Sequence, residues 1–354
     1  MDILQMNNVT QSLALSLNIV FASLVLGVTS ANAHHSNVEY DFSEIHELQG
    51  EVTHVAWRNP HVEITIRTEQ GDDRDSVWEL EAQDINSLSR SGLNGSMINV
   101  GDIVRVAGNV SMQRANNLSV NNLLLPNGTE IRLRGNPARR WSTEEHIGFD
   151  RITAEQARAE AGEGEEEGLF RVWMNTGPGG FPPQLPLTTD ARTAQANWDA
   201  ANDLTMQCIS SGMPAAMRLS PPHPIELSMD EGNIMLRVEL FDITRTIQMN
   251  SDAAASDEPA SALGHSVGHW EGDTLVINTT RINWPFFDHQ GIIPQSDTVQ
   301  VTEQLSIGDD KNLMTYEITV TDPTTFTQPV SGSWVMGWRP DMQIEPYECI
   351  APTG

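Results

Sequence analysis

The chain has 354 residues, enough for two domains that each bury their own core. Its 48 acidic residues outnumber its 20 lysines and arginines, and the formal net charge at pH 7 is −28. An acidic surface repels nucleic acid and anionic membranes, so the composition argues against both as partners.

The first 33 residues have the composition of a secretion signal. Residues 13–28 are almost entirely apolar, and a run of this length is short for a bilayer span but typical of a signal-peptide core. Ala31-Asn32-Ala33 follows as an A-x-A cleavage sequence, although the leader lacks the usual lysine or arginine. We therefore expect cleavage after Ala33, no stable membrane anchor, and a mature protein that begins at His34 in the periplasm or outside the cell.

Residues 34–135 are predicted to form a small β domain. Short apolar or alternating runs are separated by turn signals such as Asn59-Pro60. Between the third and fourth runs, residues 84–90 indicate a short helix capped by Asp84. Three strands, a helix and then further strands is the order of an OB-like barrel. The predicted strands are residues 48–57, 62–68, 76–82, 103–110, 119–125 and 130–133.

Residues 136–185 are predicted to be a disordered acidic connector between two domains. They contain GEGEEEG at 162–168 and GPGGFPP at 177–183. Charge repulsion and the high content of Gly and Pro disfavour a packed core in such a segment.

Residues 186–354 are predicted to form a second, larger β domain. A helical stretch over 189–208, opened by Asp190, precedes nine strand candidates at regular spacing. This pattern favours a lipocalin-like antiparallel barrel or a curved sheet with a pocket inside it, so the whole chain is expected to be all-β with few helices. The candidates are residues 225–229, 234–241, 245–249, 266–271, 274–281, 297–306, 312–321, 325–338 and 342–347.

Cys208 and Cys349 are the only cysteines of the chain. An even number in an exported protein suggests one disulfide. Closing so long a loop stabilises by ~4 kcal/mol when the effect is counted as lost chain entropy.

Motifs in both halves resemble families of exported bacterial proteins known chiefly from their genomes. The first half resembles small exported domains that begin His-His-Ser and carry Trp-x-Asn-Pro-His, here residues 34–36 and 57–61. The second half resembles a large uncharacterised group with a Gly-His-Ser-x-Gly-x-Trp-Glu-Gly-Asp-Thr-Leu motif. The resemblance implies an exported protein and supplies no reaction. In the second half the matching positions are residues 264–275, Glu303, residues 322–323 and residues 347–349.

The expected mature N-terminus offers a metal site. A chain that begins with His34 presents a free amine and an imidazole to one metal ion, and His35 and His61 are available to complete a three-nitrogen set. Nitrogen donors in near-planar geometry suit Cu(II). In its ligand chemistry the arrangement resembles the histidine brace of copper monooxygenases and copper carriers. The alternative is a solvated terminus with unrelated histidines.

Two closely spaced histidines suggest a second site. On an extended strand His265 and His269 lie about 13 Å apart, too far to share a metal ion unless the strand bends. We instead consider His265 as an acid or base inside the barrel, beside Glu303 or Asp288. The alternative is a strand that ends in a hairpin turn, with Trp270 in the core.

Arg245 and three aromatic residues are candidates for ligand binding. An inward-facing Arg245 needs a carboxylate partner or an anionic ligand, whereas an outward-facing one needs neither. Trp270, Trp284 and Phe287 offer aromatic surface to an apolar ligand if they line a pocket, and otherwise plug the barrel.

Two classes of function follow from these features. The first is an exported binding protein that takes copper at its mature N-terminus and a small apolar ligand in the second barrel. The second is a secreted enzyme whose acid–base site uses His265 with Glu303 or Asp288. Binding is favoured, because no catalytic arrangement in the sequence outweighs its structural explanation.

Overall fold

Strands dominate the part of the chain that the computed structural model describes, and the protein is all-β. That part is residues 39–68, 75–135, 137–142, 146–148, 153–161, 168–177, 179–217, 223–249, 259–309 and 311–351. The expected leader, His34 and His35 lie outside it. None of the described helices is long and apolar enough to cross a membrane. The helices are α1 (Ile85–Arg90), α2 (Ala154–Ala161) and α3 (Thr189–Ala196), with single 3-10 turns at Ala200–Asn202, Ala215–Met217 and Leu240–Asp242.

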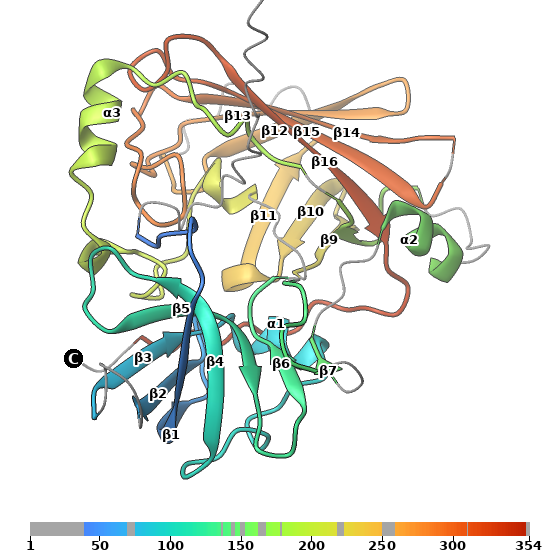
Figure 1. Cartoon of the computed structure of the whole chain (residues 1–354). Coiled ribbons are helices and arrows are strands. Elements are labelled where there is room, and N and C mark those ends of the chain that lie inside the picture. The colour runs from blue at the N-terminus through green and yellow to red at the C-terminus, as the bar shows by residue number, and fades with distance from the viewer. Residues whose placement is uncertain are drawn as a thin grey trace, which may run out of the picture. The chain divides into compact units, whose positions relative to one another are not determined.

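The first strands form a small OB-like barrel, as predicted (Figure 1). Its strands pair in the order β3-β2-β1-β4-β5, and a parallel pairing of β3 with β5 closes the barrel. Helix α1 connects β3 to β4, and two short strands extend the sheet beyond β5. The strands are β1 (His46–Ala56), β2 (Glu63–Thr68), β3 (Val77–Glu81), β4 (Ile103–Val110), β5 (Asn117–Leu124), β6 (Glu130–Arg132) and β7 (His146–Ile147).

Alternating side chains build the core of the small barrel. Ile64 and Ile66 on β2 and Val104 and Val106 on β4 are fully buried, since every second residue of a strand faces the same side. Asp84 caps α1 as predicted, and its side chain accepts a hydrogen bond from the backbone N–H of Ser87 at 2.8 Å.

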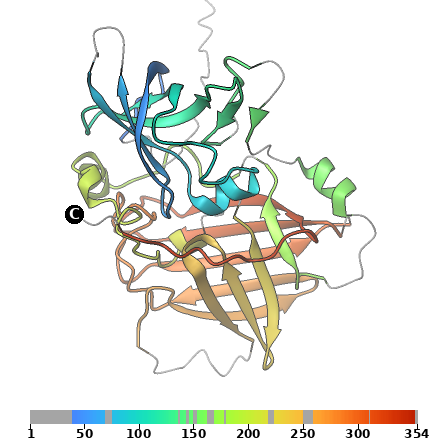
Figure 2. The ribbon, with the colours of Figure 1, turned by 90° about the horizontal axis from the view of Figure 1, so that it is seen from below.

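The remaining strands form a closed nine-stranded barrel, in the order β10-β11-β12-β13-β14-β15-β16-β8-β9 (Figure 2). All neighbouring strands are antiparallel except β11 and β12, which pair in parallel. The lipocalin-like architecture is therefore confirmed, with one departure from up-and-down pairing. The strands are β8 (Val172–Asn175), β9 (Ile225–Asp230), β10 (Asn233–Val238), β11 (Ile243–Gln248), β12 (His265–Glu271), β13 (Thr274–Thr280), β14 (Gln300–Ile307), β15 (Leu313–Thr321) and β16 (Val330–Trp338).

One strand of the large barrel comes from the segment predicted to be a connector. β8 pairs with β16 and β9, and its Trp173 and Met174 are fully buried. Residues 342–347, predicted to be the last strand, form none. β7 comes from the same segment and pairs with β6 of the small barrel. Residues 136–185 thus contribute one strand to each barrel.

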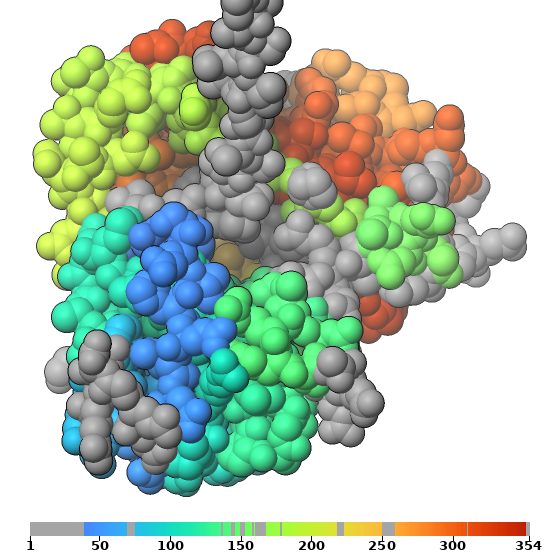
Figure 3. All heavy atoms as spheres, viewed as in Figure 1, coloured from blue at the N-terminus to red at the C-terminus, as the bar shows by residue number. Residues whose placement is uncertain are grey.

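Two helical segments cover the large barrel. Gly337 on β16 makes room for α2, since a Cβ at this glycine would lie 2.6 Å from the Cβ of Ala157. Figure 3 shows α2, in green, on the outer surface. The helix predicted over 189–208 is shorter, because α3 starts at a Thr188 cap instead of Asp190 and ends at Ala196.

The predicted disulfide is present between Cys208 and Cys349, whose Cα atoms lie 5.6 Å apart. It ties down residues 345–350, an irregular segment that we call the C-terminal strap. The loop that it closes spans 141 residues, so most of the large barrel lies between the two cysteines.

Candidate functional site

His61 lies at one end of the small barrel, in the turn between β1 and β2. Its Nδ1 is 3.0 Å from the carbonyl oxygen of Ala82. A carbonyl oxygen only accepts hydrogen bonds, so Nδ1 of the neutral ring must carry the proton and Nε2 must present its lone pair. The side chain is 22% exposed. Within the described residues Nε2 has no hydrogen-bond partner, so it is available to a metal ion.

A buried carboxylate lies behind the ring of His61. Oε1 of Glu81 is 3.7 Å from Nδ1, and the carboxylate also pairs with Arg114 at 2.9 Å and Arg134 at 3.1 Å. Burial alone would raise the pKa of Glu81, but the positive charges of His61 in its protonated form, Arg134 and Arg114 outweigh it and lower the pKa to about 2. Glu81 is therefore ionised at neutral pH, and its charge is compensated by the guanidinium groups of Arg114 and Arg134.

Glu39, the first described residue of the chain, belongs to the same network of charged side chains as Glu81 and Arg114. The carboxylate of Glu39 accepts from Nε of Arg114, whose Nη2 contacts both Glu81 and the hydroxyl of Tyr40. His34 is five residues earlier, and five residues span at most about 17 Å. Glu39 is thus one side chain, that of Arg114, away from Glu81.

No group of three or more His, Cys, Asp or Glu side chains within the described ranges is arranged to hold a metal ion. His61 is one described donor, and the other two donors predicted from the sequence, His34 and His35, lie outside those ranges.

Arg245 faces the interior of the large barrel, where the chain itself supplies its carboxylate partner. Both oxygens of Glu303 accept from its guanidinium, which also donates to Ser266 at 3.1 Å and Thr279 at 3.0 Å. The hydroxyl of Tyr316 donates to Glu303 at 2.8 Å. This buried ion pair is satisfied without a ligand, and neither oxygen of Glu303 is left for acid–base work.

The predicted acid–base pairing is not assembled in the described structure. Ser266 points inward to Arg245, so its neighbour His265 lies on the opposite face of β12 and not beside Glu303. Asp288 organises its own loop by accepting from the backbone N–H groups of Gln290, Ile292 and Ile293, at 3.0, 3.0 and 2.6 Å.

The three aromatic residues predicted to bind a ligand differ in how far they are exposed to solvent. Trp270 lies at the end of β12 and is 46% exposed, so it is not the core residue that the hairpin alternative required. Trp284 and Phe287 are buried, and Phe287 packs edge-on against Phe181 and Phe326 with ring centroids 4.8 and 5.0 Å apart. Trp284 and Phe287 therefore plug the barrel, while Trp270 lies apart from them at the surface.

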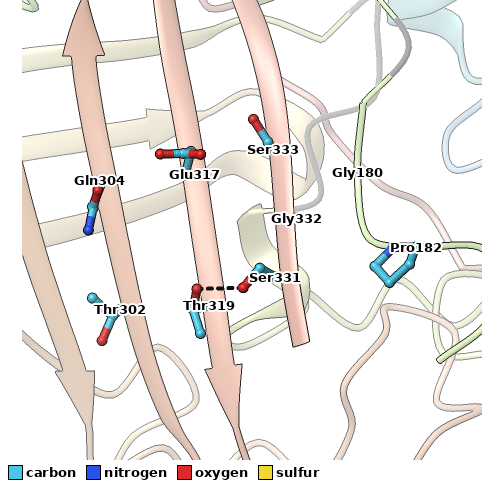
Figure 4. Close-up of a pocket in the computed structure, with 9 residues that line it drawn as sticks. All are labelled: Gly180, Pro182, Thr302, Gln304, Glu317, Thr319, Ser331, Gly332 and Ser333. Carbon is cyan, nitrogen blue, oxygen red and sulfur yellow. Dashed lines mark hydrogen bonds between the residues drawn. The ribbon is translucent and has the colours of Figure 1, made fainter. Parts of the chain in front are cut away.

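A polar groove of about 480 Å³ lies on the outer face of the large barrel. It is lined by outward side chains of β14, β15 and β16 and bordered by the segment around Gly180 and Pro182 (Figure 4). Thr319 and Ser331 share a hydrogen bond of 2.8 Å across its floor. Besides Pro182 and two glycines, its lining side chains carry hydroxyl, amide or carboxylate groups, and none of Trp270, Trp284 and Phe287 is among them.

The structure also brings together residues that no sequence pattern groups. His223 of the large barrel lies between Asp84, 3.1 Å from Nε2, and Glu239, 3.3 Å from Nδ1. Arg90 of α1 makes a two-pronged ion pair with Glu239. Together with Ser87 these residues form a buried group between the barrels, which we call the seam cluster. Its members are far apart in sequence, and only their distances reveal them.

The seam cluster has the outline of a serine–histidine–carboxylate triad. Oγ of Ser87 is 3.2 Å from Nε2 of His223. However, the same hydroxyl donates to Asp84 at 2.5 Å, and Ser87 is fully buried. Burial alone would lower the pKa of His223, but Asp84 and Glu239 outweigh it and raise the pKa to about 9. An imidazolium cannot accept a proton from a serine, so the cluster is an ionic contact between the barrels.

Comparison with known proteins finds a family model that matches part of the chain and a distant structural likeness. A family model of unknown function (DUF6152) matches residues 22–121, which cover most of the small barrel. No curated protein matches the chain. A mutant of the fluorescent protein UnaG, a solved structure, is 12% identical over 47% of this chain and 92% of that chain, with a TM-score of 0.24. The match over residues 22–121 agrees with the resemblance of the first half to an uncharacterised family.

Proposed function

We propose that the protein is an exported binding protein whose small barrel binds one copper(II) ion. In this proposal the amine and imidazole of His34 supply two nitrogens and Nε2 of His61 supplies the third, with His35 as an additional donor beside them. Three nitrogen donors in near-planar geometry suit Cu(II). The proposal assumes removal of the leader after Ala33, since a blocked amine would be a poor ligand.

The orientation of His61 is the observation that carries the proposal. Metal-binding histidines commonly donate their second ring N–H to a carbonyl or carboxylate, which fixes the tautomer and aims the free nitrogen at the metal. The hydrogen bond from Nδ1 to Ala82, with Glu81 behind it, has this form. The position of Glu39 supports it further, because Arg114 joins this residue, five positions after His34, to Glu81.

The interior of the large barrel gives less support to an apolar ligand or to an acid–base enzyme. Its inward positions are occupied by close-packed side chains such as Leu236, Ile277 and Trp334, and its one buried ion pair, among the residues described, is internally satisfied. We therefore assign the binding function to the small barrel and a supporting role to the large one.

A change at the N-terminus tests the copper site directly. The exported protein is purified, its first residue is identified by mass spectrometry, and Cu(II) affinity is measured by competition with a chelator. Acetylation of the amine of His34 is expected to weaken binding at least about 100-fold, because it removes the amine as a donor, and His61→Ala to weaken it about 10- to 100-fold or more.

The matched control is His54→Ala, which removes an exposed histidine from β1. It should leave the affinity unchanged. Equal affinity for the wild-type protein and the acetylated form would exclude the N-terminal amine as a ligand and overturn the proposal.

A further inference from the structure

The C-terminal strap contacts the two residues that precede His61. Nδ2 of Asn59 donates to the carbonyl oxygen of Tyr347, and the backbone N–H of Ile350 donates to the carbonyl oxygen of Asn59 at 3.1 Å. The hydroxyl of Tyr347 donates to the carbonyl oxygen of Pro60 at 3.4 Å. Asn59 and Tyr347 are both buried. The strap therefore holds the turn that presents His61.

The strap is fixed at its other side to the large barrel. The backbone N–H of Tyr347 donates to Asp242 at 3.0 Å, and its ring lies 4.9 Å from that of Phe241. The backbone N–H of Glu345 donates to Glu239 of the seam cluster at 3.0 Å. The disulfide joins the end of the strap to Cys208. The strap thus connects the large barrel to the turn beside His61.

Asn59 contacts both the strap and the small barrel. Its Oδ1 accepts from the backbone N–H of Ile85 at 2.7 Å, at the start of α1, while its Nδ2 donates to the carbonyl oxygen of Tyr347 in the strap and to Oδ1 of Asn86 in α1 at 3.1 Å. One amide therefore fixes the turn to the helix of its own barrel and to a segment held by the other. His61 itself has a single side-chain hydrogen bond, to Ala82, so its direction depends on the backbone of the turn.

We propose that the C-terminal strap positions His61 as a metal ligand, with Asn59 as the positioning residue. The inference rests on the proposed function for the identity of the ligand. Residues that orient a metal-binding histidine typically change metal affinity 10- to 100-fold when they are altered. The large barrel would then contribute to copper affinity without supplying a donor atom.

Two independent variants test the strap. Asn59→Asp keeps the acceptor for Ile85 but replaces the donor to Tyr347 and Asn86 by a carboxylate oxygen, which repels the carbonyl of Tyr347. Cys208→Ser together with Cys349→Ser removes the covalent tie and leaves the hydrogen bonds of Asn59 intact. Each is compared with Asn283→Asp, which removes an exposed donor to the carbonyl oxygen of Ala260 in the large barrel.

Two readouts are measured on each folded variant: Cu(II) affinity with its electron paramagnetic resonance spectrum, and the ¹⁵N shifts of the His61 imidazole in metal-free protein. In the wild type we expect protonated Nδ1 and bare Nε2. Both strap variants should show a mixture of tautomers, about 10-fold weaker copper binding and an altered copper spectrum, whereas Asn283→Asp should match the wild type.

The two readouts separate the failure of this inference from that of the proposed function. If strap variants change the His61 tautomer but the wild type binds no copper, the positioning role stands and the copper proposal falls. If copper binding depends on His61 but both strap variants keep the wild-type affinity, spectrum and tautomer, the positioning role is overturned.

Discussion

Arg245 and Glu303 are buried together among apolar side chains of the large barrel, where neither charge is stable alone. Removing two charges from water costs several kcal/mol for each ion, and their attraction repays this only when the hydrogen bonds are complete. Here Ser266, Thr279 and Tyr316 complete them. We infer that this ion pair fixes how the side chains of the barrel interior pack.

At this scale we predict an asymmetric response to mutation. Glu303→Leu leaves the Arg245 charge uncompensated and should lower the free energy of unfolding by about 3–5 kcal/mol. The double change Arg245→Met with Glu303→Leu should recover most of that loss, because it removes both charges and keeps the volume. Urea denaturation of the three proteins measures this. A double variant no more stable than the single one would show that shape, and not charge, dominates the site.

Among the elements, strands with alternating side chains were predictable and irregular ones were not. The order of strands and helix in the small barrel, and the Asp84 cap, follow from local periodicity and turn residues. β8 was missed because it is short and lies beside glycine- and glutamate-rich sequence, so only its pairing with β16 and β9 reveals it. The side chains of residues 342–347 alternate in polarity like those of a strand, yet these residues are irregular. Tyr347, in the strap, contacts Asn59 and Asp242.

The same distinction applies to the sites. His61 could be singled out from its motif, because an Asn-Pro turn before a histidine is a local signal, and its role as a metal ligand stays a prediction. The seam cluster was not found, because His223 meets Asp84 and Glu239 only through the assembly of the two barrels. His265 is kept from the Arg245 site because the alternate residues of β12, including Ser266, face the interior of the barrel. The sequence of β12 could not predict which set of residues faces inward, because both sets contain polar residues.

The docking of α2 on β16 gives a prediction for an element. Gly337→Ala would bring a methyl group to 2.6 Å from both Ala157 and Thr176, so the helix must shift. We expect a loss of about 1–3 kcal/mol in the free energy of unfolding. Gly308→Ala is the matched control, because no atom lies within 4 Å of its added Cβ. Similar stabilities for the two variants would contradict close packing of α2.

For the molecule as a whole, the seam cluster makes the contact between the barrels depend on pH. The pKa of His223 is raised from 6.5 to about 9, so the folded state holds a proton that the unfolded chain releases. This stabilisation is fully present below about pH 6.5 and is lost as the pH rises through about 9. The shift corresponds to roughly 3 kcal/mol. Asp84, Glu239, Arg90, Ser87 and Tyr347 surround the ring, and burial raises the pKa of the Tyr347 hydroxyl well above its usual value, so that hydroxyl does not titrate in this range.

The test is the free energy of unfolding from pH 6 to pH 10 in the wild type and in His223→Gln. The free energy of unfolding should fall across this range by more in the wild type than in the variant. The difference between the two falls is the contribution of His223, because the amino terminus and the single lysine, Lys311, are present in both proteins. The variant itself should be destabilised at pH 6, since Asp84 and Glu239 then share a buried site without the cation between them. Parallel pH profiles for the two proteins would show that His223 is neutral in the folded state. In that case the barrels would be held together by the strap, the disulfide and the pairing of Arg90 with Glu239, and the contact between them would not respond to alkaline pH.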